Sequence, residues 1–162
     1  MALVRHLRAR RADQRGVALV EFAIALPVLA ILVMGVVDLG RAYALSSRLS
    51  NAAREGARFG QFAPEQVAVT GVCLPTESIT WYANHEDGAN AWTVSVDRMN
   101  GQTATPITGC KTMQDPAATV FPGARIRVRV STSFSVLTPL VGALVGNQIT
   151  MTRSQEVVVQ GR

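Results

Sequence analysis

Apolar residues are concentrated in one long run near the amino end of the chain. From Val17 to Val37 the only charged residue is Glu21. A helix over this run would be about 31 Å long, which matches the hydrocarbon core of a bilayer. The pattern therefore predicts a transmembrane helix over residues 17–37.

The helical pattern continues beyond this run. Small and apolar residues recur at helical spacing up to residue 60, and arginines occupy the other sides. Gly60 and Pro64 are typical of a helix end, so one long helix is expected over residues 17–60. Within it a strip of small residues repeats every four positions: Ala52, Ala53, Gly56, Ala57 and Gly60. Such a strip lets another backbone approach closely, and it packs either on this protein's own sheet or on a neighbouring subunit.

The remainder of the chain, residues 61–162, has the pattern of a small β-rich domain. Residues 124–134 alternate, with Ile126, Val128, Val130 and Phe134 on one face and three arginines on the other. Segments 93–99 and 148–160 are candidate antiparallel partners. The apolar segment 136–146 is too short to span a bilayer and is expected to form a buried loop or a short helix. The predicted class is α+β: a long amino-terminal membrane helix followed by a small antiparallel sheet. The arginines are expected to form a solvated face.

The positive charge lies almost wholly at the amino end. Residues 1–16 hold five arginines and one aspartate, a net +4 of the chain's +5. The rest has no basic face and few aromatic residues, which argues against a nucleic-acid partner. Basic residues before a span stay in the cytoplasm, so the carboxyl end is expected on the other side. A secretory signal peptide is the alternative, but the run exceeds the usual 7 to 15 or so residues and no A-x-A-like site follows.

Glu21 is unusual because a carboxylate at the centre of a membrane helix costs about 2.5–3.5 kcal/mol. It lies only about 6 Å along the axis from Val17, where water and headgroups reach. One explanation is a carboxylate tolerated at this edge. The other requires a chain cut before Val17, which would place a new amino group, with an ordinary pKa of about 7.7 to 8.0, four residues from Glu21. In a low-dielectric setting the two would attract strongly, within one chain or between adjacent subunits.

Pro27 lies one and a half turns after Glu21. It lacks a backbone donor and obstructs the carbonyl of Ala23, so it is expected to kink or loosen the helix. Membrane helices tolerate proline because neighbouring groups offset the loss. The kink is either incidental or an aid to packing between subunits.

The residues around Gly16 resemble a known processing site. Gly16 followed by VALVEFA, with Glu21 as the fifth residue after the glycine, resembles the cleavage site of type IV pilin-like precursors. The longer pattern is similar to the TadE family of minor pilins from the tight adherence (Flp pilus) machinery, and the last third of the chain also looks TadE-like. The residues that carry the resemblance are the basic leader, Gly16, Val20-Glu21-Phe22, Pro27, Gly35, Gly40 and the AAREGAR block 52–58.

The resemblance implies a structural protein of the bacterial inner membrane, with no cofactor and no catalytic residues. A membrane prepilin peptidase would cut between Gly16 and Val17 and release residues 1–16 as a leader. Glu21 and Phe22 would then guide alignment with other pilin subunits at the pilus assembly platform. The main rival is a single-pass anchor that is never cleaved, with residues 61–162 binding a surface ligand.

Two further groups of residues bear on function. Cys73 and Cys110 lie on the far side of the predicted membrane and lack metal-ligand spacing, so one disulfide is expected. His85, Glu86 and Asp87 are adjacent and point in different directions, so a solvated turn is favoured over a metal or acid–base site. A secreted enzyme is therefore the least favoured reading.

Overall fold

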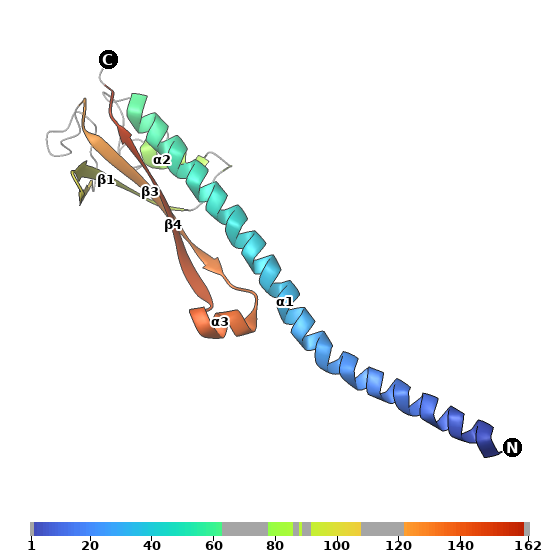
Figure 1. Ribbon diagram of the computed structural model, residues 1–162. Coiled ribbons are helices and arrows are strands. Elements are labelled where there is room, and N and C mark those ends of the chain that lie inside the picture. Colours follow the sequence, from blue (N-terminus) through green and yellow to red (C-terminus); the bar gives the residue numbers. More distant parts are fainter. Residues whose placement is uncertain (1, 63–77, 86–87, 89–91, 108–121, 161–162) are drawn as a thin grey trace. The chain divides into compact units, whose positions relative to one another are not determined.

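One helix accounts for the first part of the chain. In the computed structural model, which describes residues 2–62, 78–85, 88, 92–107 and 122–160, helix α1 spans Ala2–Phe62 (Figure 1). It also includes the residues before Gly16, where alanine, leucine and arginine favour helix. It ends between the two stop signals, Gly60 and Pro64.

After α1 the described chain forms two short helices and four strands. In order they are α2 (Ile79–His85), β1 (Thr93–Asn100), β2 (Thr103–Pro106), β3 (Arg125–Ser135), α3 (Pro139–Val145) and β4 (Gln148–Val158). The strands form one sheet of order β2-β1-β3-β4, and every neighbouring pair is antiparallel. The α+β class, a long amino-terminal helix followed by an antiparallel sheet, is confirmed.

Strand β3 is central in the sheet, and the alternation of its side chains is as predicted. Ile126, Val128 and Val130 are fully buried on one face. β1 and β4 flank it, so all three predicted strands are present with small shifts at their ends. The apolar segment after β3 contains a short helix, α3, one of the two forms expected for it.

Strand β2 is an addition to the predicted sheet. It forms a hairpin with β1 through the two loop residues Gly101 and Gln102. Gly101 has φ of 62°, a conformation that glycine adopts without strain and that the first position of a two-residue hairpin loop requires. The short strand therefore follows from a local turn signal.

The chain divides into two compact units. One combines Met1–Gly40 with Val136–Asn147, and the other combines Arg41–Ser135 with Gln148–Arg162. In the second unit, the carboxyl half of α1 and helix α2 pack on the apolar face of the sheet (Figure 1). The core side chains are Leu49, Ala52, Ala53 and Ala57 from α1, Ile79 and Ala83 from α2, and Val96, Ile107, Ala124, Ile126, Val128, Val130 and Val159 from the sheet and its flanks.

Candidate functional site

The amino half of α1 exposes an apolar surface on all of its sides. The large apolar side chains between Val17 and Val37 are each 39–70% exposed. A Cβ added at Gly16, Gly35 or Gly40 would meet nothing within 4 Å, so the helix surface around them is open. Burial of apolar surface is the dominant driving force of association in water. By length and composition this helix can cross a membrane, and it is the only such helix among the residues that were described.

The residues of the predicted processing and alignment site lie on this open surface. Gly16, Val17, Glu21 and Phe22 are all exposed, in one continuous stretch of helix. Pro27 lies inside the helix, and helical backbone continues on both sides of it. The structure of this single chain therefore leaves these side chains accessible to lipid or to another helix.

The strip of small residues is buried within this chain. Ala52 and Ala57 are 0% exposed and Ala53 is 1% exposed. A Cβ added at Gly56 would lie 3.0 Å from the Ala83 Cβ, 3.1 Å from the Ile79 carbonyl oxygen and 3.3 Å from Val128 Cγ1. The absence of a side chain at Gly56 thus lets α1 approach α2 and β3 closely, and the strip lies on this protein's own sheet.

Asp38 is a functional candidate that the sequence analysis did not identify. It follows Val37 directly, at the carboxyl end of the apolar run, and is 6% exposed. Its Oδ2 accepts hydrogen bonds from the Thr138 backbone N–H at 2.8 Å and from the Thr138 hydroxyl at 2.7 Å. The Leu137 N–H donates to the same carboxylate, with its nitrogen 3.1 Å from each oxygen. Asp38 therefore ties the start of α3 to α1, and the only sequence signal for it is a carboxylate at the edge of the run.

Within the second unit, two arginines join α1 to the strands. The Arg41 guanidinium lies 5.2 Å from the centre of the Phe134 ring, and its Nη1 donates to the Ser135 carbonyl at 3.4 Å. Arg153 of β4 donates to the Ser46 hydroxyl, at 2.7 Å from Nη2 and 3.1 Å from Nε. These polar contacts link α1 to β3 and β4 in addition to the apolar core.

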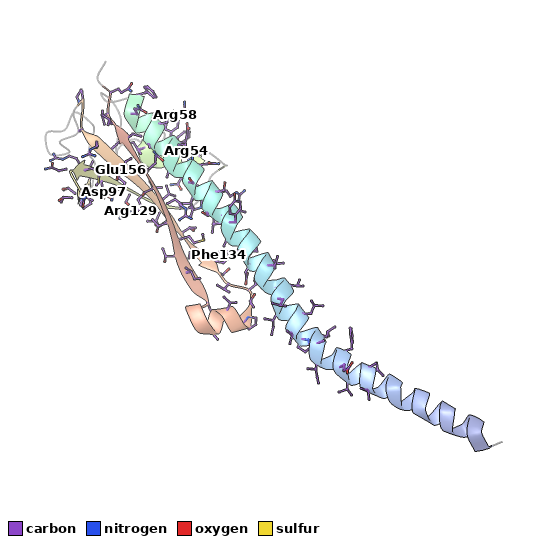
Figure 2. The ribbon with its side chains drawn as sticks, viewed as in Figure 1. Arg54, Arg58, Asp97, Arg129, Phe134 and Glu156 are labelled. Atoms are coloured by element: carbon purple, nitrogen blue, oxygen red, sulfur yellow. The ribbon has the colours of Figure 1, made fainter. Side chains whose placement is uncertain are left out.

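The arginine face of β3 pairs with acidic residues of the neighbouring strands. Arg127 Nε donates to Glu156 of β4 at 2.8 Å. Arg129 Nη2 lies 3.1 Å from Oδ2 of Asp97 in β1, whose side chain is only 6% exposed (Figure 2). That distance defines an ion pair, although Oδ2 accepts no hydrogen bond of good geometry from the described residues. Arg127 and Arg129 thus form ion pairs between strands of the sheet, which the sequence pattern alone did not predict.

The remaining candidate residues do not form a site in the part of the chain that the structure describes. The His85 ring stacks on Trp81 with centroids 4.2 Å apart, and its Nδ1 is 2.9 Å from the Trp81 carbonyl oxygen. No group of three His, Cys, Asp or Glu residues suited to a metal occurs among the described residues. Cys73, Cys110, Glu86 and Asp87 lie outside the described residues.

Comparison with known proteins finds one family match, within the helical part of the chain. Residues 16–58 match the family model described as TadE-like protein. The match begins at the glycine of the predicted processing site and ends in the buried strip of small residues. No curated protein and no solved structure matches the chain significantly.

Proposed function

We propose that this chain, a TadE-like protein by its residues 16–58, is a minor pilin that takes part in assembly of an adhesive Flp-type pilus. One observation carries the proposal. The family match coincides with a helix whose first 21 residues after Gly16 are apolar except for Glu21, and whose large apolar side chains there are exposed on all sides. Such an apolar surface is unfavourable in water. In this proposal lipid buries it first, while the helix is in the membrane, and other pilin helices bury it later, in the assembled filament.

The charge distribution supports one orientation in the membrane. The five arginines of residues 1–16 precede the apolar run and hold the amino end in the cytoplasm. The sheet domain then lies outside the inner membrane, where Cys73 and Cys110 can oxidise to a disulfide. A membrane prepilin peptidase acts at the cytoplasmic edge of the span, between Gly16 and Val17.

Glu21 supplies the alignment step in this proposal. Cleavage leaves a cationic amino group on Val17, and the Glu21 carboxylate lies four residues along the same helix. A neighbouring subunit that brings its amino group to this carboxylate is held in register, because the attraction between the two charges strengthens once packed helices exclude water from them. The exposure of Glu21 in the single chain leaves it accessible to that neighbour.

The test is a pair of charge-neutral variants in cells that assemble the pilus. Glu21→Gln keeps the shape of the side chain but removes its charge, and Glu55→Gln is the matched control, since Glu55 pairs with Arg58 outside the apolar run. We expect Glu21→Gln to remain in the membrane fraction but to reduce the yield of sheared surface filaments, whereas Glu55→Gln leaves the yield unchanged. Normal filament yield with Glu21→Gln would instead favour an uncleaved membrane anchor whose outer domain binds a ligand.

A further inference from the structure

The segment Val136–Asn147, which contains α3, is apolar and partly exposed. It has no charged residue. Leu137 is 60% exposed, and Pro139 and Ala143 are also exposed. Exposure of a large apolar side chain such as Leu137 to water is unfavourable, and the uncharged residues around it offer no charge that would favour water over an apolar phase.

The segment is a closed and internally bonded excursion from the sheet. The Val136 N–H donates to the Asn147 carbonyl at 3.1 Å, which joins its two ends. The N–H groups of Gly142 and Gly146 donate to the carbonyls of Thr138 and Gly142, each at 2.9 Å. Because these backbone donors have partners inside the segment, contact with an apolar phase leaves none of them unpaired.

Asp38 sets the position along the axis of α1 at which the start of this segment is attached. Its carboxylate binds Leu137 and Thr138, and it is the first residue after Val37. The segment and the apolar half of α1 also belong to the same compact unit. If Val17–Val37 spans the bilayer, Asp38 lies where hydrocarbon gives way to headgroups, and the start of α3 lies at the same depth.

We propose that the segment Val136–Asn147 docks into the outer interface of the lipid bilayer and forms a second membrane contact beside the spanning helix. The occupant is lipid, because Asp38 holds the start of this uncharged segment, with the exposed Leu137, next to the outer end of the apolar run of α1. Apolar segments of about 10–14 residues are too short to span a bilayer, and placement at the membrane interface is one of the arrangements that they adopt. Two lipid contacts on one unit restrict rotation of α1 about its own axis, which presents one side of it to neighbouring subunits. The inference rests on the proposed membrane insertion of α1.

Depth-dependent fluorescence quenching tests the docking. The full chain with Trp81→Phe and Trp92→Phe receives a single tryptophan and is reconstituted in phosphatidylethanolamine–phosphatidylglycerol vesicles that carry 6,7-dibrominated acyl chains. Leu137→Trp probes the segment, Leu29→Trp lies within the span, and Asn51→Trp, an exposed position about 21 Å past Val37, reports the aqueous side. If the double Phe background loses its far-ultraviolet circular dichroism, the same variants are made with both native tryptophans present, and the quenching of the parent is subtracted.

We expect quenching at Leu137→Trp to approach that at Leu29→Trp and to exceed that at Asn51→Trp by at least about two-fold. Quenching equal to that at Asn51→Trp, with Leu29→Trp strongly quenched, would overturn the docking but leave the spanning helix intact. A blue-shifted but unquenched emission at Leu137→Trp would show that protein covers the segment and would likewise overturn the lipid assignment. Absence of quenching at Leu29→Trp would overturn membrane insertion and the docking with it.

Discussion

The Asp38→Ala substitution is the sharpest test of how α3 is held to α1. It removes the acceptor of three donors: the N–H of Leu137 and the N–H and hydroxyl of Thr138. A hydrogen bond to a charged group contributes about 1.5–3 kcal/mol, and a buried donor left unpaired costs about 1–3 kcal/mol. The three contributions share one carboxylate and do not add, and water reaches part of the vacated site. We therefore expect about 2–4 kcal/mol of local destabilisation.

Native-state hydrogen exchange of the protein in lipid nanodiscs measures this quantity directly. Since about 1.4 kcal/mol corresponds to a factor of ten, the amides of Leu137 and Thr138 are expected to exchange about 30- to 700-fold faster in Asp38→Ala. Thr138→Val is the matched control, because it removes only the hydroxyl donor and should accelerate exchange by about ten-fold or less. Amides of β1 and β3 serve as the internal reference and should be unchanged. Equal exchange at Leu137 and Thr138 in the parent and in Asp38→Ala would refute the clamp.

Three other predictions follow from packing, charge and covalent chemistry. Gly56→Ala is expected to lower the free energy of unfolding in urea by about 1–2 kcal/mol, because the new Cβ meets a backbone carbonyl and another Cβ. Gly60→Ala is the control and is expected to be near neutral, because its Cβ meets only isoleucine side chains, which can shift. A larger loss for Gly60→Ala than for Gly56→Ala would contradict this packing. Arg129→Gln removes the ion-pair partner of the buried Asp97 carboxylate and is expected to lower the free energy of unfolding by about 1–3 kcal/mol. Arg127→Gln is expected to lower it by less than about 1 kcal/mol, because its partner Glu156 is exposed. Equal losses in the two variants would contradict this difference in burial. Peptide mapping with and without reductant is expected to find the two cysteines joined, and two free thiols would exclude the disulfide.

Local sequence patterns were enough to predict α1 and the strands β1, β3 and β4. The alternation in β3 is visible because each side chain's face depends only on its own position in the strand. β2 was missed although Gly101-Gln102 has the glycine that the first position of a two-residue hairpin loop favours, because a four-residue strand carries too short an alternation to detect. Helix α2 was missed because its seven residues lie in a region without a recognisable repeat.

In the candidate site, too, features of one continuous segment could be predicted, whereas contacts between distant residues could not. The apolar run and Glu21 are predictable, since hydropathy and an isolated charge are properties of one continuous segment. The Asp38 clamp joins residues about a hundred positions apart, and the ion pairs of the arginine face join different strands. The clamp depends on the return of a distant part of the chain to α1, and the ion pairs depend on strand order and register, so no local pattern predicts either of them. The role of the small-residue strip was likewise undecided until the positions of Ala83 and Val128 were known.

The proposed alignment role of Glu21 depends on processing before Val17, because the cut creates the amino group that the carboxylate binds. Intact mass and amino-terminal sequencing of the protein extracted from membranes of pilus-assembling cells test it directly. We expect a mature chain that begins at Val17. A chain that still begins at Met1 in cells that make the pilus would contradict it.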